Sequence, residues 1–291
     1  MALWNLGSIN VDVIYSVPHI PAPGETLAST SRSVLLGGKG ANMSVAAARA
    51  GCAVHHIGAV GRDGGWTVER LAKYGVQTDL IRETESDTAQ AIIAVSKDGE
   101  NSIILHPGAN ADIPLDLIEA AVAQATAGDW FVTQNETNMQ PEALARAKAK
   151  KLDVAYAAAP FSARAVIEVL PFLDLLILNE VEAAQLQQAL GRAPSELDIR
   201  DVVVTLGKDG ADWFGPNGVQ RIPAIKVDPV DSTGAGDTFT GYLLAGLAQG
   251  QGMEAALATA SAAGALMVTR FGTADVIPTM AEVAEFILRN R

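Results

Sequence analysis

Between residues 115 and 207, segments with the spacing of helices alternate with short apolar runs. The helical segments are expected at 115–127, 141–151, 162–170 and 180–190, and the apolar runs are WFVTQ, DVAYAA, LLILN and DVVVTLG. Alternation of this kind is typical of strand–helix–strand units, in which parallel strands form one sheet with helices on its faces. The chain is therefore predicted to be an α/β protein with a doubly wound, mainly parallel sheet. Ligands of such sheets bind beyond the carboxyl ends of the strands.

Two other stretches have the pattern of strands joined by turns. Residues 10–36 contain two apolar runs around a proline-rich bend, and residues 88–108 contain two more around a turn at Asp98-Gly99. We expect these two stretches to form a small β-sheet at the ligand edge of a single domain that spans residues 1–291. The other predicted elements are a strand at 3–9, a hairpin at 211–227 and helices at about 236–249, 253–269 and 279–289.

Charge and composition exclude several classes of ligand and location. The formal net charge is −12 and no run of basic residues occurs, so nucleic acid is not an expected ligand. The single cysteine, Cys52, allows no intrachain disulfide and is expected to be buried. No signal peptide or membrane-spanning run is recognisable, so we expect a cytoplasmic protein without membrane contact. The histidines lack the spacing of metal ligands and are interpreted as structural or surface residues: His19, His55, His56 and His106.

The segment DSTGAGD, residues 231–237, precedes a predicted helix and is the most informative motif. Backbone N–H groups of Gly234, Ala235 and Gly236 can face an anion at the helix N-terminus, where the helix dipole adds positive charge. Asp237 can then accept a proton from a substrate hydroxyl. The alternative is that Asp237 merely caps the helix.

A second glycine-rich segment, GGKGAN at residues 37–42, lacks the spacing of a phosphate-binding Walker A loop and of a GxGxxG dinucleotide motif. Its glycines permit close approach of the backbone to a ligand, and Lys39 and Asn42 can bind a polyhydroxy compound. Asp12, which follows the first predicted strand, can accept hydrogen bonds from vicinal hydroxyls. The alternatives are a flexible turn before a helix and a solvated residue at a strand end.

Two further motifs follow predicted strands. Asn179 and Glu182 lie three residues apart in a first helical turn, where they can hold water on Mg²⁺ or form an ordinary N-terminal capping box. Thr205 and Gly207 follow the next strand, where they can contact a nucleotide or simply lead out of the strand.

Together these motifs resemble the PfkB carbohydrate kinase family, and its ribokinase branch most closely. The matching segments are GSINVD (7–12), PGET (23–26), GGKGAN (37–42), DGENSIILHPGAN (98–110), NEVE (179–182), TLGKDG (205–210), DSTGAGD (231–237) and VTRFG (268–272). The resemblance spans nearly the whole chain. It implies a Rossmann-like domain with a β-sheet lid, and ATP-dependent transfer of a phosphoryl group to a primary hydroxyl of a pentose-like sugar such as ribose.

The resemblance also implies roles for individual residues. Asp237 would be the base and Gly234, Ala235 and Gly236 the anion hole. The sugar-binding residues would be Asn10, Asp12, Gly38, Lys39, Asn42, Glu136 and Asp237. Asn179, Thr205, Gly207 and Gly236 would bind ATP, and Glu182 would bind Mg²⁺ through water. A monovalent cation such as K⁺ would lie beside Asp231 and Thr233 and the backbone carbonyls near Arg270 and Gly272, and two copies of the chain would pair through their lids.

Some positions depart from the family pattern. Ser232 replaces a threonine, Ala157–Ala159 replace a polar residue, and Gln90 replaces an apolar residue of the lid, so contacts to the ligand can differ there. A kinase of the same fold that acts on a nucleoside, fructose or a keto-sugar acid remains an alternative, with Tyr15, Ile92 and Ile104 as an apolar wall for a base. A sugar phosphate is less expected because the lid adds few cations. An alternative of a different class is a non-catalytic sugar or nucleotide sensor.

Overall fold

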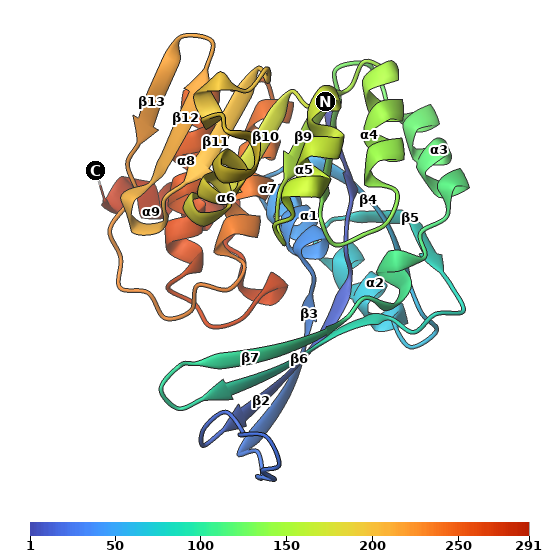
Figure 1. Ribbon diagram of the computed structural model, residues 1–291, viewed down its shortest axis with the longest axis vertical. Helices are drawn as coiled ribbons and strands as arrows, with labels where there is room; N and C mark the ends of the chain where they lie inside the picture. Colours follow the sequence, from blue (N-terminus) through green and yellow to red (C-terminus); the bar gives the residue numbers. More distant parts are fainter. Residues whose placement is uncertain (291) are drawn as a thin grey trace.

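The computed structural model describes residues 1–290 and consists of a large α/β body from which a small sheet projects (Figure 1). The nine-stranded sheet of the body has the order β13-β12-β11-β10-β9-β8-β1-β4-β5. Its strands are β1 (Ala2–Leu6), β4 (Ala53–Val60), β5 (Gln77–Glu83), β8 (Trp130–Gln134), β9 (Asp153–Ala157), β10 (Leu175–Asn179), β11 (Asp201–Thr205), β12 (Ala211–Gly215) and β13 (Gly218–Ile222). From β11 to β5 neighbouring strands are parallel, and β12 and β13 add an antiparallel hairpin at one edge.

Helices cover both faces of this sheet, as expected for a doubly wound fold. They are α1 (Lys39–Arg49), α2 (Gly65–Lys73), α3 (Leu115–Gln124), α4 (Gln140–Ala149), α5 (Ala163–Val169), α6 (Glu180–Leu190), α7 (Ala235–Ala248), α8 (Met253–Met267) and α9 (Met280–Arg289). One hydrophobic core joins the sheet to α1, α7 and α8, and a second joins its other face to α3, α4 and α6. Successive strand residues alternate between the two cores: Val203 belongs to the first, and Val202 and Val204 belong to the second.

The small sheet has four strands in the order β3-β2-β6-β7. They are β2 (Asn10–Val17), β3 (Ser31–Gly37), β6 (Ala89–Ser96) and β7 (Asn101–His106), of which β2 and β6 are parallel and the other pairs are antiparallel. Asp12 pairs with Leu35 and Ala91, so these side chains share one face; Val13 pairs with Val34 and Ile92 on the other face. The register therefore decides which side chains of this sheet can meet a ligand.

Most predicted elements are present with small shifts in their ends. α6 has the predicted bounds, and glycines with positive φ follow α1 and α2, at Gly51 (84°) and Gly75 (89°). Two expectations differ from the structure. α1 already begins at Lys39, within the glycine-rich segment 37–42 that could have been a turn before a helix, and no strand was predicted at β5, whose sequence is mostly polar.

The buried position expected for Cys52 is confirmed. Among residues 1–290, none of the helices combines the length and the apolar character needed to span a bilayer.

Candidate active site

Asp237 lies in the first turn of α7. The chain enters this helix through Gly234, whose φ of 72° lies in the left-handed region that favours glycine. The carboxylate of Asp237 is 8% exposed, and Nδ2 of Asn42 donates a hydrogen bond to its Oδ2 at 2.9 Å. Burial raises the pKa of Asp237, whereas the charge of Lys39 and the bond from Asn42 oppose that rise. Asp237 is not a helix cap, because the cap position is Gly234 and the carboxylate contacts α1 instead.

The N–H groups at the start of α7 differ in their availability. The N–H of Ala235 donates to the carbonyl of Ser232 at 3.3 Å. Within residues 1–290, the N–H groups of Gly236 and Asp237 have no hydrogen-bond partner. Of the predicted anion hole, the N–H groups of Gly234 and Gly236 are therefore free among the described residues, and that of Asp237 adds a third donor.

Lys39 begins α1 and lies in the electrostatic field of carboxylates from distant parts of the chain. The charge of Asp237 is the largest influence on its pKa and raises it, against the opposing effect of burial. Glu136, Glu182 and Asp12 raise this pKa further. These acids come from β2, from the segment after β8, from α6 and from α7, so residues assigned to the sugar, the metal and catalysis converge around one cation.

Asp12 is 7% exposed on β2. Its pKa is raised to about 7, mainly by burial and then by the nearby charges of Glu136 and Asp237, while Lys39 lowers it. A Cβ atom at Gly37 would lie 2.0 Å from Oδ2 of Asp12, so glycine is needed there to leave room for the carboxylate. Asp12 is thus a buried acid that titrates near neutral pH.

Glu136 connects the loop after β1 with the start of α1. Its Oε2 accepts hydrogen bonds from Oγ of Ser8 and from the backbone N–H of Lys39, the latter at 3.1 Å. Oγ of Ser8 in turn accepts from the N–H of Gly40 at 3.1 Å. Burial raises the pKa of Glu136, and Lys39 and Ser8 oppose it. Sequence reasoning assigned no role to Ser8, although it lies within the GSINVD segment.

Asn10 and Asn42 are each 4% exposed. Asn42 binds Asp237, and Oδ1 of Asn10 accepts a hydrogen bond from Nδ2 of Asn110 at 2.8 Å. Gly38 has a φ of 94°, and a Cβ atom there would lie 3.0 Å from the backbone nitrogen of Asn10. The predicted sugar-binding residues are therefore packed closely together at the junction of β2 and α1.

A buried polar chain fixes this junction from the side of the body. A Cβ atom at Gly40 would lie 2.4 Å from Cα of Gly7, so α1 and the loop after β1 touch through their backbones. Asn5 donates to the carbonyl of Gly40 and to Oγ of Ser44, both at 2.9 Å. Ser44 contacts Nδ1 of His56 at 2.8 Å, and Nε2 of His56 contacts the carbonyl of Gly7 at 3.0 Å. Burial lowers the pKa of His56 to about 4, which keeps the ring neutral and confirms the structural role expected for it.

Three of the four residues predicted to bind ATP lie at the carboxyl ends of β10 and β11, and the fourth, Gly236, lies in the first turn of α7. Asn179 pairs with Thr205 in the register of these strands, and Gly207 follows with a φ of 55°. Asn179 and Glu182 form a capping box: Oδ1 of Asn179 accepts from the N–H of Glu182 at 2.9 Å, and Oε2 of Glu182 accepts from the N–H of Asn179 at 2.8 Å. Asn179 and Glu182 thus form the N-terminal capping box that was the alternative to a metal site. Oε1 of Glu182 is left for another partner.

This arrangement bears on the predicted Mg²⁺. No group of three or more histidine, cysteine, aspartate or glutamate side chains that could hold a metal occurs in the described part of the chain. A single free carboxylate oxygen, Oε1 of Glu182, fits a hydrated ion held through its waters rather than a direct cage.

Asp231 ties the segment before α7 to the segment after α8. Its Oδ1 accepts from the N–H of Thr233 at 2.9 Å, and its Oδ2 accepts from the N–H of Gly272 at 3.2 Å. The structure thus brings together three of the four residues predicted to lie beside a monovalent cation. At Arg270 the prediction concerns the backbone carbonyls nearby, whereas its guanidinium donates to the carbonyl of Val276 at 3.0 Å and to Glu282 at 2.6 Å.

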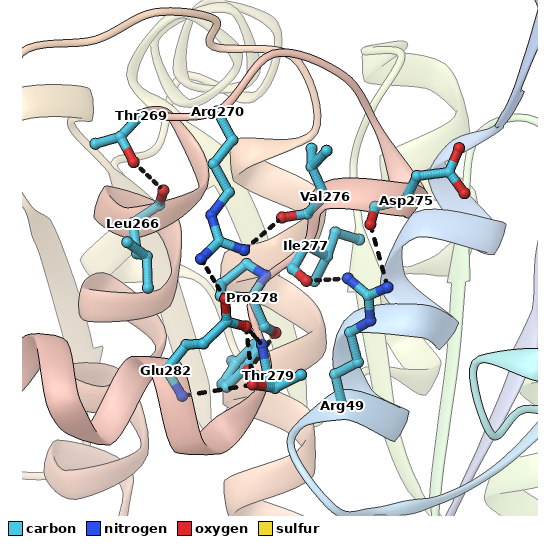
Figure 2. A network of polar contacts seen from close by, with 11 residues as sticks. Arg49, Leu266, Thr269, Arg270, Asp275, Val276, Ile277, Pro278, Thr279 and Glu282 are labelled. Carbon is cyan, nitrogen blue, oxygen red and sulfur yellow. Dashed lines mark hydrogen bonds and ion pairs between the residues drawn. The ribbon is translucent and has the colours of Figure 1, made fainter.

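Arginines from two elements hold the segment that follows Gly272 (Figure 2). Arg49, the last residue of α1, donates to the carbonyls of Asp275 and Ile277, and Arg270 donates to the carbonyl between them. The segment is therefore anchored to the same helix whose first turn carries Lys39.

Several lid residues point away from the site. Gln90 and Ile92 alternate with Ala91, the partner of Asp12, so they face the opposite side of the small sheet. Ile104 pairs with Ile92, and Tyr15 also faces away from Asp12. The expectations that Gln90 contacts the ligand and that Tyr15, Ile92 and Ile104 form a wall for a base are wrong, because the strand register turns these side chains outward.

Two other regions add no polar group to the site. Ala157 and Ala158, at the end of β9, are 4% and 1% exposed, and their methyl side chains cannot hydrogen-bond a ligand. A surface hollow of about 350 Å³ lies between β13 and residues 194–202, and none of the residues gathered around Lys39 lines it.

Comparisons with known proteins agree with this geometry. The model of the pfkB family of carbohydrate kinases matches residues 3–280. A ribokinase of Haemophilus influenzae is 36% identical over 297 residues, which covers 97% of this chain and 97% of that protein.

Solved structures are similar over the same extent. A ribokinase from Thermotoga maritima is 31% identical with a TM-score of 0.89, and the match covers 99% of both chains. A ribokinase from Arabidopsis thaliana, solved in complex with ribose and ATP, is 28% identical with a TM-score of 0.87 and the same coverage. The chain belongs to the pfkB family of carbohydrate kinases.

Proposed function

We propose that this protein is an ATP-dependent kinase that transfers the γ-phosphoryl group to a primary hydroxyl of ribose. The observation that carries the proposal is the buried carboxylate of Asp237, which is held by Asn42 at the start of α7 and lies in the field of Lys39. The ribose and ATP bound to the Arabidopsis thaliana relative support the choice of substrates. Because ATP is the donor, the proposal assigns the enzyme to the cytoplasm.

Proton transfer is assigned to Asp237. The substrate hydroxyl gives its proton to the carboxylate while its oxygen forms a bond to the γ-phosphorus, and the bond to the leaving ADP oxygen breaks. A raised pKa makes Asp237 a stronger base, and Lys39 and Asn42 favour its ionised form against the effect of burial. The free N–H groups of Gly236 and Asp237, together with the helix dipole, stabilise charge that develops on the phosphoryl oxygens.

The acceptor sugar is assigned to the cluster of polar side chains at the junction of β2 and α1. Buried acids and amides are suited to bind several hydroxyls and to exclude water, which competes as a phosphoryl acceptor. The sugar-binding set consists of Asn10, Asp12, Gly38, Lys39, Asn42 and Glu136, with Asp237 at the reacting hydroxyl.

The nucleotide is assigned to the carboxyl ends of β10 and β11 and to the start of α7, with Asn179, Thr205, Gly207 and Gly236 as contacts. Bound Mg²⁺ neutralises charge on the phosphates, and Glu182 would hold it through water. These phosphates would approach Lys39 from the side of α6, in keeping with the influence of Glu182 on the pKa of Lys39.

A monovalent cation such as K⁺ is assigned to the loop between Asp231 and Thr233 and to the backbone near Arg270 and Gly272. Its charge would support the anion hole at the adjacent start of α7. The hydrogen bonds that hold both loops to Asp231 support a site there, because they fix the carbonyls on either side of it.

The small sheet is assigned a lid function, and two copies of the chain are proposed to pair through it. Its outward face carries Val34, Ile92 and Ile104, which are 40%, 40% and 67% exposed. Apolar side chains clustered on an exposed sheet face are typical of a surface that is covered by a partner.

The proposal is tested by a coupled ADP-release assay with Mg²⁺-ATP, a panel of sugars and nucleosides, and either K⁺ or Na⁺. Turnover that is highest with ribose and increases with K⁺ is expected. Turnover with a nucleoside, fructose or a keto-sugar acid alone would keep the base and reassign the acceptor. No turnover by the folded protein with any acceptor would overturn the proposal in favour of a sensor.

A further inference from the structure

Asn110 lies where the chain leaves the small sheet and returns to the body. It belongs to a short 3₁₀ turn, Gly108–Ala111, directly after β7, and it is 2% exposed. The N–H of Ala109 binds the carbonyl of Asp87 at 2.9 Å, just before β6 begins, so the turn closes the base of the sheet. None of the roles proposed above uses Asn110.

The direction of the Asn110 carboxamide is fixed by the backbone. The N–H of Ile9 donates to Oδ1 of Asn110 at 3.0 Å. Only the oxygen of a carboxamide can accept this bond, so Nδ2 of Asn110 must point the other way. It donates to Oδ1 of Asn10 at 2.8 Å.

This contact in turn fixes the direction of the Asn10 carboxamide. Turning Asn10 around would place two N–H₂ groups against each other, and Asn110 cannot turn because of Ile9. Asn10 therefore keeps Nδ2 as its free group, and this donor has no hydrogen-bond partner within residues 1–290. Asn10 shares a face of β2 with Asp12, which lies in the field of Lys39, so the free donor is on the sugar side.

Asn42 is held the other way around, with its amide oxygen rather than its amide nitrogen left free. Its Nδ2 donates to Asp237, and its Oδ1 is buried without a partner among the described residues. A buried orphan acceptor is costly unless a ligand donates to it. Asn10 thus offers an N–H donor to a ligand, and Asn42 offers a carbonyl acceptor.

We propose that Asn110 is a positioning residue that determines specificity by holding Asn10 with its amide nitrogen toward the sugar, so that the hydroxyl at Asn10 must accept a hydrogen bond while the hydroxyl at Asn42 must donate one. This inference rests on the proposed sugar-kinase function and deepens it. Asn110 acts through Asn10 and does not touch the substrate.

Sugar analogues can distinguish a hydrogen-bond donor at Asn10 from an acceptor at Asn42. Fluorine in place of a hydroxyl can accept a hydrogen bond weakly but cannot donate one. A fluorosugar altered at the position facing Asn10 should therefore bind better than the corresponding deoxysugar, whereas fluorine facing Asn42 should give no such advantage. Asn110→Asp keeps an acceptor for Ile9 and offers a second acceptor to Asn10, which reverses the Asn10 carboxamide and turns its carbonyl toward the sugar.

The experiment measures kcat and KM for ribose and for its 2- and 3-monodeoxy and monofluoro analogues, with wild type, Asn110→Asp and Asn138→Asp. Asn138 is a matched control, because its carboxamide bonds the backbone of Ile113 nearby without touching Asn10. In Asn110→Asp, KM for ribose should increase about tenfold with KM for ATP unchanged, the loss expected for one hydrogen bond. The fluoro-over-deoxy preference at one carbon should disappear in this variant and persist in Asn138→Asp.

A parallel loss of kcat/KM for ribose and all analogues in Asn110→Asp would overturn the inference and leave the sugar-kinase function intact. A wild type with no fluoro-over-deoxy preference at either carbon would also overturn it. If Asn110→Asp does not fold, Asn10→Asp places an acceptor at the same point and should abolish the same preference. Absence of ribose turnover by wild type would instead overturn the proposed function.

Discussion

The two sides of the candidate active site are built differently. On the acceptor side, Asn10, Asp12, Asn42 and Asp237 are 4%, 7%, 4% and 8% exposed and are joined by hydrogen bonds and mutual charge. On the nucleotide side, Asn179, Gly207 and Gly236 are exposed and Thr205 is half-buried, and Glu182 alone is buried, at 9% exposed. The contacts there are local ones, within a helix cap and a strand end.

This difference indicates which side carries selectivity. A buried polar group needs a partner, so a wrong acceptor leaves donors or acceptors unsatisfied and is rejected strongly. Exposed backbone groups at strand and helix ends can bind the phosphates of many compounds. When a phosphate is absent, water can bond to these groups instead, so a mismatched ligand costs little free energy. Substitutions on the acceptor side should therefore have larger effects than substitutions on the nucleotide side.

The largest expected effect is that of Asp237→Asn. Loss of the base should lower kcat at least about 10²-fold, and the KM for sugar should change little. Steady-state kinetics measure both, and Asp198→Asn, an exposed aspartate away from the site, is the control. A kcat close to that of wild type would remove Asp237 from the role of base.

Glycine substitutions compare the packing of the two sides. A Cβ atom at Gly40 would lie 2.4 Å from Gly7, whereas a Cβ atom at Gly236 meets nothing within 4 Å. Gly40→Ala should lower the free energy of unfolding by about 1–3 kcal/mol, as overpacking does. Gly236→Ala should leave it unchanged or slightly increased. Urea denaturation measures both, and equal losses in the two variants would contradict the difference in packing.

The pH dependence should reflect Asp12, whose pKa is raised to about 7. If its ionised form binds sugar hydroxyls, kcat/KM for the sugar should decrease as the pH falls below 7. Well below that pH the decrease should be about tenfold for each pH unit. The pKa of Asp12 is higher in the folded protein than its ordinary value of 3.8, so wild type loses stability as pH increases from about 4 to 7.

Asp12→Asn removes this titration. The variant should therefore gain in Tm over wild type at pH 8 and lose that gain near pH 4, while losing sugar affinity throughout. Thermal unfolding at several pH values provides the measurement. A Tm difference independent of pH would show that Asp12 does not titrate as described.

The smallest expected effect is that of Glu182→Gln on the nucleotide side. Glutamine retains an acceptor for the N–H of Asn179, so stability should change little. The Mg²⁺ concentration for half-maximal activity should increase by about tenfold or less, because one charge-assisted contact is lost. Glu180→Gln, an exposed neighbour in the same turn, is the control. An unchanged Mg²⁺ requirement would contradict the metal assignment.

Much of the fold follows from local sequence pattern. The short strands β8 and β10 are buried apolar runs bounded by helices, and they coincide with the predicted WFVTQ and LLILN. β5 was not predicted because its sequence, QTDLIRE, is mostly polar. This segment forms a strand through its pairing with β4. Local pattern identifies strands that are buried on both faces and misses strands that depend on a neighbour.

The motif residues of the site were predictable from the sequence, but the face of the small sheet on which each side chain lies was not. Asp12, Lys39, Asn42 and Asp237 converge as the motifs indicated. Gln90 was misassigned because the face of a strand residue depends on a register between segments far apart in sequence, which local pattern does not specify.

Supporting residues were missed for a related reason. Asn110 and Ser8 lie within motifs of the family, but their roles consist of hydrogen bonds to residues about 100 or more positions away. Only the fold brings these partners together. The position of Asn110 in the HPGAN segment was the available signal, and it carried no indication of function.

The central claim is tested most directly by following the products of the wild-type protein with ribose and Mg²⁺-ATP by ³¹P NMR. The account predicts that one sugar phosphate ester, on the primary hydroxyl, forms for each ADP released. Release of ADP with inorganic phosphate and no ester, or no consumption of ATP with any sugar by the folded protein, would contradict it.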